Sequence, residues 1–500
     1  MKITRITLQN FRAFRGNVPL DVDLGGGKNL LVFGENGSGK TSLFLALNDF
    51  LEASDKALEI TDTPFRNLFA EPADQTFVNL KFSDGDDYKW SITDTENQTA
   101  DIRVVNKTKG FIDYKKLLHT YFLQQEERSV NVFRFFVETL LANSFNDTGA
   151  WTFGDKWNEI YHEIQKRNDA RQSETIQDLI TEFNGGLTVK IAEIEAKAQS
   201  ILELFYKENL TIKIRFGGVD YPADRKDRIK TGKNIENQII NLSVDFYTKQ
   251  EANHHQFLNE AKLSAVALSV YLASLPITKD NAPRLIALDD VLIGLDMANR
   301  LPILNILESH FPNDQIFFFT YDRAWFEIVK SRVQNKWKVL EFFTSKTDEL
   351  ELPIVQDSKT YIQKANAYYD ANDYKAAAVY GRSHFEKIMK KFCQGKSVAV
   401  RFNEQLRKVS ANDLWTAIEK ASKFNAEENR TKGKSEWIVT DDLIKKINRN
   451  SKTLLNEAVH SSSETIHGGE MREAIDAVAE LEEELKAILK ATNGGKTEDD

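Results

Sequence analysis

Short runs of apolar residues recur through the first two thirds of the chain, each about the length of a β-strand. Three of them are uninterrupted, as is typical of strands buried on both faces of a parallel sheet: residues 30–33, 285–288 and 316–319. Residues 338–343 predict a fourth strand of the core. Other runs alternate apolar with polar positions and predict antiparallel strands; they lie within residues 3–24, 75–105, 212–216 and 240–244.

A helical period replaces these runs between residues 114 and 206. Two charged amphipathic segments, 157–180 and 189–205, flank Asn184-Gly185-Gly186, which are residues typical of a turn. The pattern therefore predicts a helical hairpin that turns at these glycines. Each arm spans only a few heptads, so any coiled coil is short.

The pattern divides the chain into five parts. Two strand-containing lobes frame a helical insertion, and a helical bundle and an acidic tail follow; the boundaries are 1–113, 114–210, 211–348, 349–490 and 491–500. The predicted fold class is α/β. It comprises an antiparallel β subdomain and a parallel α/β core, with a short helical-hairpin insertion and an all-α C-terminal domain.

Composition indicates an ordinary soluble globular protein, with 41% hydrophobic and 28% charged residues. The net charge of -9 argues against a protein that coats nucleic acid by bulk charge, although it leaves room for a local basic patch. The single cysteine, Cys393, cannot form an internal disulfide, which favours a reducing cytoplasm. The N-terminus has no apolar signal core and the chain has no run of eighteen apolar residues, so we expect neither export nor a membrane span.

The strand at residues 30–33 leads into Gly34-Glu35-Asn36-Gly37-Ser38-Gly39-Lys40-Thr41-Ser42, which fits the phosphate-loop pattern G-x-x-x-x-G-K-[ST]. Its glycines let successive backbone N–H groups point at phosphate oxygens, and the helix that follows adds its positive N-terminal end. Lys40 is predicted to reach the β- and γ-phosphates of ATP, and Thr41 to ligate Mg²⁺. The other residues of this loop that are predicted to contact the nucleotide are Asn36, Gly37, Ser38, Gly39 and Ser42. A glycine-rich turn that binds nothing is the alternative, and it leaves the flanking strand and helix unexplained.

The strand at residues 285–288 ends in Asp289-Asp290. In a parallel α/β sheet the carboxyl ends of the strands meet at one edge, where ligands bind, so these carboxylates are expected beside the phosphate loop. Asp289 is predicted to hold Mg²⁺, directly or through water, and Asp290 to orient or deprotonate the attacking water. The plainer alternative is an acidic turn after a strand.

Two further residues are candidates for contacts with the nucleotide, and each also has a simpler structural explanation. Arg12 lies between Phe11 and Phe14 and could contact the nucleotide base, or it could be an exposed residue on a hairpin core. Gln124 follows an apolar turn and could sense the γ-phosphate and its metal, although a solvated helix face is the commoner role of such a residue.

Over about residues 1–345 the chain resembles the ATPase head of the SMC/RecF branch of the ABC superfamily. The resemblance rests on Asn10-Phe11-Arg12, Gly34–Ser42, the helix from Leu258, Asp289-Asp290, Gly294-Leu295-Asp296 and Thr320-Tyr321-Asp322. It implies a homodimer in which each ATP lies between the phosphate loop of one head and the signature motif of the other. By this resemblance Asn259 and Lys262 belong to the signature, Asp290 replaces the catalytic glutamate, and Tyr321 occupies the switch position.

The sequence departs from the family's pattern at three positions. Asn259 stands for the signature serine, with Glu260 and Ala261 in place of its glycines, while Asp290 and Tyr321 stand for a glutamate and a histidine. Asparagine can still donate a hydrogen bond to a γ-phosphate, but a shorter carboxylate must lie closer to its water, and a phenol cannot act as an imidazole. We therefore expect slow hydrolysis, or the use of ATP as a dimerising clamp.

The short hairpin, which lacks a hook cysteine pair, resembles the compact ATPases of bacterial phage defence: those of Septu, of PARIS, and of OLD proteins without their Toprim nuclease. This resemblance implies an ATPase that regulates a separate nuclease or toxin effector.

One alternative is a RecF-like DNA-repair clamp, with DNA bound by the basic run at residues 224–233, for which a solvated loop is the plainer explanation. Another is an ATP-gated ribonuclease with a HEPN-like C-terminal bundle. His384 follows Arg382 too closely for the HEPN spacing, and Asn456 with His460 gives only a faint similarity, so a dimerisation or partner-docking bundle is preferred.

Overall fold

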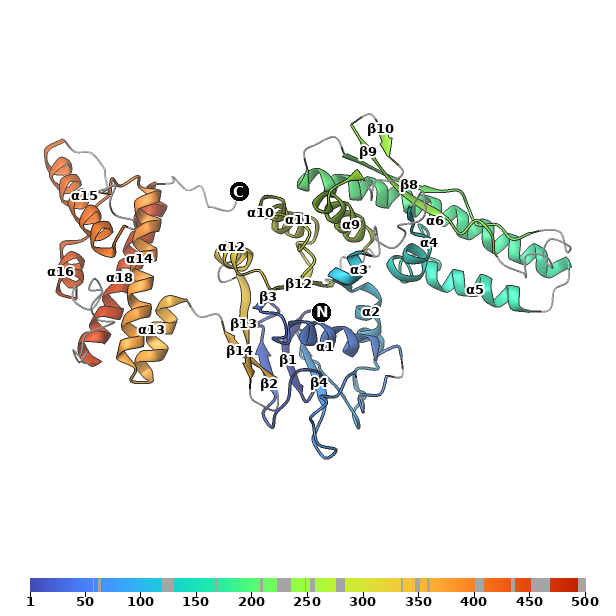
Figure 1. The fold of residues 1–500 in the computed structure, drawn as a ribbon, viewed down its shortest axis with the longest axis horizontal. Coiled ribbons are helices and arrows are strands. Elements are labelled where there is room, and N and C mark those ends of the chain that lie inside the picture. The colour runs from blue at the N-terminus through green and yellow to red at the C-terminus, as the bar shows by residue number, and fades with distance from the viewer. Residues whose placement is uncertain are drawn as a thin grey trace. The chain divides into compact units, whose positions relative to one another are not determined.

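The computed structural model describes residues 1–56, 58–61, 64–118, 130–166, 170–206, 210–222, 235–247, 249–251, 257–275, 284–333, 336–346, 351–357, 360–400, 409–432, 437–450 and 468–492. They belong to two compact units, Met1–Asp357 and Ser358–Asp500, which share no hydrophobic core (Figure 1).

A six-stranded sheet forms the centre of the first unit, in the order β14-β13-β3-β12-β11-β6. The strands are β3 (Asn29–Gly34), β6 (Gly110–Asp113), β11 (Leu285–Asp289), β12 (Gln315–Thr320), β13 (Trp337–Lys346) and β14 (Glu351–Asp357). All neighbours are parallel except β13 and β14. Phe33 pairs with Thr320, and Asp289 pairs with both Phe319 and Asp113, so the carboxyl ends of β3, β6, β11 and β12 meet at one edge.

Alternate residues of the buried strands enter two different cores. Leu31, Ile286 and Phe318 belong to one cluster, while Leu30, Ala287 and Phe317 belong to the other. The first core is completed by α9 (Glu260–Ser274), α11 (Pro302–His310), α12 (Arg323–Val333) and the helical insertion, and the second by α1 (Lys40–Glu52) and the N-terminal strands. Burial on both faces explains why these strands read as continuous apolar runs.

An antiparallel sheet in the order β2-β1-β4-β5 forms the N-terminal subdomain, as predicted. Its strands are β1 (Ile3–Gln9), β2 (Leu20–Asp23), β4 (Phe77–Phe82) and β5 (Asp87–Ser91). The prediction of strands up to residue 105 is wrong, because Ala100–Thr108 form helix α2. The Thr99 hydroxyl caps this helix, and Ile102 and Val105, three residues apart, are buried on one face.

The helical insertion and a small sheet lie between β6 and α9. The helical elements are α3 (Tyr114–Leu118), α4 (Phe133–Phe135), a π-helical turn (Phe136–Leu140), α5 (Phe153–Gln165) and α6 (Ala170–Phe205). The strands are β7 (Val130–Asn131), β8 (Leu210–Phe216), β9 (Ile240–Phe246) and β10 (Lys249–Glu251), with β9 pairing with the other three. The predicted strands at residues 212–216 and 240–244 are confirmed as β8 and β9, and the short strand β7 lies within the segment predicted to be helical.

A helical hairpin exists, but it is not the predicted one, because the chain does not turn at Asn184-Gly185-Gly186. Helix α6 runs unbroken through these residues, and α5 is the other arm, packed beside it (Figure 1). The Asn184 side chain accepts from the Val219 N–H at 3.0 Å and donates to the Val219 carbonyl at 2.9 Å. A Cβ on Gly186 would lie 2.9 Å from the Trp151 ring. Both residues therefore serve packing between elements, which local turn preferences cannot reveal.

The second unit is helical in all its described parts. Its helices are α13 (Tyr361–Asp370), α14 (Tyr374–Gly395), α15 (Ala411–Lys432), α16 (Asp441–Arg449) and α18 (Gly468–Thr492). Phe385, Trp415 and Val478 are among the residues that form their common core. The bundle begins later than the predicted residue 349, because residues 351–357 pair with β13 as strand β14 of the first unit. No helix in the described part of the chain is long and apolar enough to cross a membrane.

Candidate nucleotide site

The phosphate loop connects β3 to α1. Gly37 and Gly39 have φ angles of 84° and 93°, in the left-handed region that favours glycine. A Cβ on Gly39 would also lie 2.9 Å from Pro353 of β14 and 3.3 Å from the Phe14 ring. Conformation and space both exclude a side chain at Gly39, so the loop can place its backbone N–H groups around an anion at the start of α1.

The Lys40 side chain is only 4% exposed and lies against its own loop. Its Nζ donates to the carbonyl oxygens of Gly34, at 2.7 Å, and Glu35, at 3.1 Å, and lies 3.9 Å from Asp290 Oδ2. Burial lowers the pKa of Lys40, and the charges of Asp290 and Asp289 oppose that shift. The Lys40 ammonium thus lies between the phosphate loop and the end of β11, and Asp290 lies beside that loop, as the strand order predicted.

Thr41 and Asp289 meet directly, although 248 positions separate them in the chain. The Thr41 hydroxyl donates to Asp289 Oδ2 at 2.9 Å. Burial, followed by the charge of Asp290, raises the pKa of Asp289 to about 6, while Thr41 and Lys40 oppose this rise. The other carboxylate oxygen, Oδ1, is buried without a hydrogen-bond partner among the described residues.

These two residues fit a magnesium site. Mg²⁺ takes oxygen ligands and is usually bound by one or two protein groups together with phosphates and water. Thr41 and Asp289 supply a hydroxyl and a carboxylate, and the unpartnered Oδ1 is the kind of buried polar atom that a cation or its water would satisfy.

Asp290 lies beside this pair in a left-handed conformation, with φ of 53°. Its Oδ1 accepts the backbone N–H of Tyr321 at 2.9 Å, and its own N–H donates to the Phe319 carbonyl at 3.2 Å. Burial raises the pKa of Asp290, and Lys40 and the Tyr321 N–H oppose the rise. A carboxylate held in this way, with a raised pKa, is suited to orient or accept a proton from water.

The Tyr321 side chain is 39% exposed, and the contact with Asp290 is made by its backbone. The next residue, Asp322, accepts from Arg300 Nη1 at 2.5 Å, while Arg300 Nε donates to the Leu295 carbonyl at 2.7 Å. Arg300 thereby joins the loop after Asp290 to the loop after β12. Sequence reasoning missed Arg300, because no local pattern indicates its partner.

Asp113 is a second residue that sequence reasoning missed. It ends β6 and pairs in register with Asp289 on β11, and its charge adds to the rise in the pKa of Asp289. The sequence did indicate this position, because the apolar pair Phe111 and Ile112 comes directly before the Asp113 carboxylate, as expected at the end of a buried strand.

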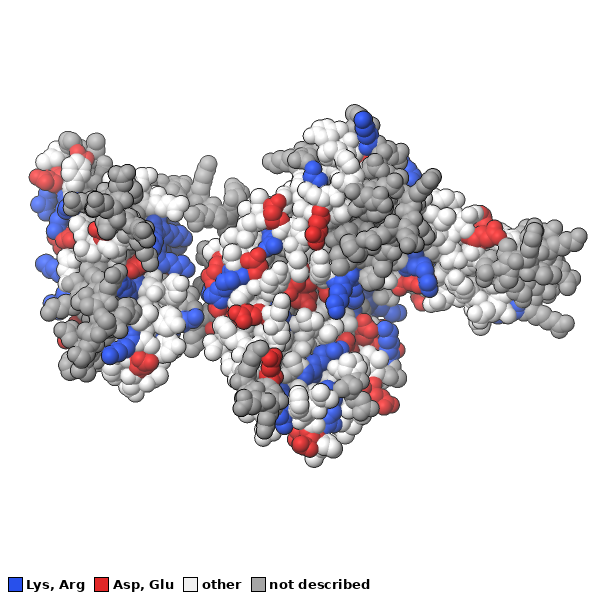
Figure 2. All heavy atoms as spheres, in the orientation of Figure 1, with Lys and Arg blue, Asp and Glu red and all other residues white. Residues whose placement is uncertain are grey.

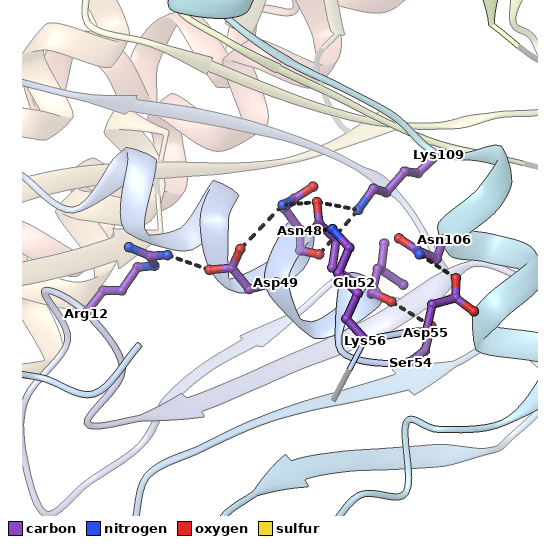
Figure 3. A network of polar contacts seen from close by, with 10 residues as sticks. Arg12, Asn48, Asp49, Glu52, Ser54, Asp55, Lys56, Asn106 and Lys109 are labelled. Atoms are coloured by element: carbon purple, nitrogen blue, oxygen red, sulfur yellow. Dashed lines mark hydrogen bonds and ion pairs between the residues drawn. The ribbon is translucent and has the colours of Figure 1, made fainter. Parts of the chain in front are cut away.

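Arg12 is directed towards the end of α1 rather than its beginning. Its Nη2 donates to Asp49 Oδ2 at 2.6 Å, and its guanidinium carbon lies 5.6 Å and 5.8 Å from the ring centroids of Phe11 and Phe65 (Figure 3). The structure therefore brings Phe14, rather than the Arg12 side chain, to the phosphate loop. Contact between Arg12 and a nucleotide base stays a prediction.

Asn259 is the N-cap of α9, and its Oδ1 accepts from the Lys262 N–H at 3.0 Å. The Lys262 ammonium lies 4.9 Å from the Phe246 ring centroid. A Cβ on Gly294 would lie 3.3 Å from Glu260 Cγ, so the loop after Asp290 packs against the start of α9. The predicted signature position therefore adjoins the Gly294 loop of its own chain.

Several predicted residues lie outside the described part of the chain. They are Gln124, the basic run at 224–233, Asn456, His460 and most of the acidic tail. Their proposed contacts stay predictions.

Residues 2–338 match the protein family described as the RecF/RecN/SMC N terminal domain. That match covers more than half of the chain, and together with the sheet topology it confirms the predicted fold class of an ATPase head with a parallel α/β core. Among the curated proteins, none matches this sequence significantly.

Solved structures of SMC heads are similar to part of this chain. An SMC head bound to the C-terminal winged-helix domain of ScpA has 11% identity and a TM-score of 0.38, over 72% of this chain and 98% of that one. The SMC head from Pyrococcus furiosus, bound to the C-terminal domain of ScpA, has 11% identity and a TM-score of 0.39, over 71% and 96%. The head from Thermotoga maritima has 12% identity and a TM-score of 0.32, over 71% and 100%.

Proposed function

The chain belongs to the RecF/RecN/SMC N-terminal domain family of ATPase heads, and from this premise we propose that it is a slow, Mg²⁺-dependent ATPase that dimerises on ATP. We propose further that it acts in the cytoplasm and regulates a separate nuclease or toxin effector in anti-phage defence. The ATPase part is supported by the site, and the defence setting by resemblance to compact phage-defence ATPases.

Each polar residue at the sheet edge has a definite role in this proposal. The phosphate-loop N–H groups and Lys40 bind the β- and γ-phosphates, which replace the carbonyl oxygens that Lys40 now contacts. Thr41 and Asp289 would hold Mg²⁺, which supplies charge neutralisation at the phosphates. Asp290 orients the attacking water and accepts its proton, with its carboxylate fixed by the Tyr321 N–H.

One observation carries the ATPase proposal: the Thr41 hydroxyl lies 2.9 Å from a buried Asp289 carboxylate whose second oxygen is unpartnered among the described residues. A structural hydrogen bond would not require a buried carboxylate with an unsatisfied oxygen, because such an oxygen destabilises the fold by about 1–3 kcal/mol. A metal ligand explains that oxygen.

The Asp290→Asn variant tests the chemical step. It keeps a side chain of the same shape but removes the base, so we expect phosphate release to fall about 100-fold or more while ATP binding persists. Glu308→Gln, an exposed change on α11, is the matched control and should hydrolyse ATP as the parent does. Parental turnover by Asp290→Asn would show that its assigned role is wrong.

The dimer proposal is supported by the position of Asn259 at the start of a 15-residue helix, whose N-terminal end favours a phosphate. Asn259→Asp is a sharp test, because aspartate caps a helix as well as asparagine but repels a γ-phosphate. We expect this variant to bind ATP yet remain monomeric in light scattering with ATP and Mg²⁺. Dimerisation equal to the parent's would place the signature contact elsewhere.

The effector proposal is tested by expressing the chain with the reading frame beside its own. A nuclease or toxin encoded there should form a complex with the chain, and its toxicity should change in the Lys40→Ala variant. An effector whose activity is the same with the parent, with Lys40→Ala and without the chain would refute regulation in trans.

A further inference from the structure

One face of the second unit combines tyrosines with lysines. The tyrosine–lysine face consists of Tyr361, Lys364 and Tyr368 on α13 and of Tyr380 and Lys387 on α14. The spacings of three, four and seven residues place each set along one side of its helix. The two sides meet, because α13 and α14 pack as a hairpin (Figure 1).

The rings and ammonium groups of this face are ordered against one another. Tyr368 and Tyr380 are stacked, with ring centroids 5.3 Å apart and an interplanar angle of 3°. Tyr361 lies 6.5 Å from Tyr380. The Lys364 ammonium is 5.6 Å from the Tyr380 ring, and that of Lys387 is 5.9 Å from the Tyr361 ring. Because these contacts fix the side chains, little conformational entropy is lost when a ligand binds them.

The outer rings remain available to a ligand. Tyr361 is 42% exposed and Tyr368 is 39% exposed, so part of each residue lies in solvent, while the contacts with neighbouring rings set its position. An exposed aromatic ring presents a flat apolar surface, to which another flat ring can stack.

Charge on this unit is separated between its helices. Seven Lys and Arg outnumber three Asp and Glu between Thr360 and Val400, whereas seven acidic residues outnumber three basic ones in α18. The three carboxylates between Thr360 and Val400 all have partners: Glu386 pairs with Arg382, Asp370 pairs with Arg472, and Asp373 accepts the Ala376 N–H. In Figure 2, blue side chains gather on the surface beside α14. The face therefore favours an anionic ligand.

The residue types favour nucleic acid over protein. Cores of protein interfaces are enriched in tyrosine and arginine but depleted in lysine. Here both cations are lysines, and the exposed large apolar side chains of α13 and α14 in the described residues are tyrosines only. Sites for single strands combine aromatic stacking with basic side chains along the backbone. A duplex keeps its bases stacked on each other and cannot offer them to these rings.

We propose that the tyrosine–lysine face binds single-stranded nucleic acid, with bases stacked on Tyr361 and Tyr368 and phosphates bound by Lys364 and Lys387. This function lies beyond the ATPase site and does not depend on it.

Fluorescence anisotropy of the full chain with labelled 20-mers of oligothymidine, oligouridine and a duplex tests the proposal. The parent should bind one or both single strands more tightly than the duplex. Tyr361→Ala with Tyr368→Ala should weaken that binding about tenfold or more, because each stacked base contributes substantially. Lys364→Ala with Lys387→Ala should lower the slope of log K against log salt by about 1.4.

Two further double variants control the experiment. Tyr361→Phe with Tyr368→Phe keeps both rings and should bind as the parent does. Lys423→Ala with Phe424→Ala removes a lysine and a 60% exposed aromatic ring from α15 of the same unit, and should also leave binding unchanged.

Three results would overturn the proposal. The first is that the parent does not bind a single strand at low salt. The second is that the tyrosine-to-alanine variant binds with the parent's affinity. The third is that the α15 control loses as much affinity as the tyrosine-to-alanine variant. Loss of a bound protein partner from the tyrosine variant, with unchanged nucleic-acid affinity, would instead identify the face as a protein interface. Preference for oligouridine or oligothymidine distinguishes RNA from DNA as the ligand.

Discussion

The position of the candidate site could be predicted from the sequence. Its residues are Asp289, Asp290, Lys40 and Thr41. An apolar run that ends in carboxylates and another that ends in a phosphate loop must meet if both are parallel strands of one sheet. The structure brings these four side chains together. What the sequence could not show is the contact of the Tyr321 backbone with Asp290, because it depends on the left-handed conformation of Asp290.

Arg12 shows the opposite case. Its neighbours Phe11 and Phe14 indicated a place for a base, but the partner that determines its direction, Asp49, lies at the other end of α1. Asp49 is one member of the polar network in Figure 3, which joins the last turn of α1 to Lys109 just before β6. Such partners are remote in sequence, and no local pattern identifies them.

This network predicts an acid dependence of stability at Glu52. Burial alone would raise the pKa of Glu52, but Lys109, Lys56 and Asn48 outweigh it and lower the pKa to about 2 from an ordinary value near 4.5. A lowered pKa stabilises the fold above the unfolded value, and this stability is lost as the pH falls from about 4.5 to about 2. Glu52→Gln should therefore lower the free energy of unfolding at pH 7 by about 1–3 kcal/mol.

Urea titrations of the parent and Glu52→Gln at pH 7 and pH 3 provide the measurement. The difference between the two proteins should shrink at pH 3, while Glu308→Gln should match the parent at both. A difference that is the same at both pH values would mean that the carboxylate charge contributes nothing.

At the scale of elements, the sequence predicted that a helical insertion exists, but it did not predict where the helices of that insertion begin and end. Asn184-Gly185-Gly186 has turn composition, yet it lies inside α6 because Asn184 hydrogen-bonds Val219 and Gly186 leaves room for Trp151. Strand β14 was missed as well. Its Pro353 lies against the phosphate loop at Gly39, in a segment that composition assigned to the helical bundle. In each case a tertiary contact outweighed the local signal.

The two adjacent glycines of α6 predict opposite effects on stability. Gly185 has no atom within 4 Å of an added Cβ, so Gly185→Ala should stabilise the first unit by up to about 1 kcal/mol through helix propensity. At Gly186 the added methyl would meet the Trp151 ring at 2.9 Å, so Gly186→Ala should destabilise it. Thermal unfolding of both variants is the test. Stabilisation by Gly186→Ala would show that the Trp151 ring can move to make room for the methyl group without destabilising the fold.

At the scale of the whole molecule, the division into an α/β head and a helical C-terminal part was predictable because the hydrophobic period changes from strands to helices. The boundary was not, since β14 extends the head to Asp357. Separate cores mean that the site and the tyrosine–lysine face belong to different compact units. The net charge of -9 likewise hides a basic pair of helices beside an acidic one.

Two compact units predict two calorimetric transitions, and the nucleotide should shift only one of them. A non-hydrolysable ATP analogue with Mg²⁺, at 100 times its Kd, should stabilise the first unit by about 2.7 kcal/mol. The transition of the helical unit should stay in place, because none of the predicted nucleotide contacts belongs to it. A single transition, or an equal shift of both, would show that the two units unfold as one.

The central claim is that Lys40, Thr41 and Asp289 hold a triphosphate and its metal, and isothermal titration calorimetry with a non-hydrolysable ATP analogue tests it most directly. The parent should bind the analogue more tightly with Mg²⁺ than without it. Thr41→Val should lose that dependence on Mg²⁺, and Lys40→Ala should lose binding about 100-fold or more, whereas the exposed Lys56→Ala should bind as the parent does. Equal affinity in the parent, Thr41→Val and Lys40→Ala, with or without Mg²⁺, would contradict the account.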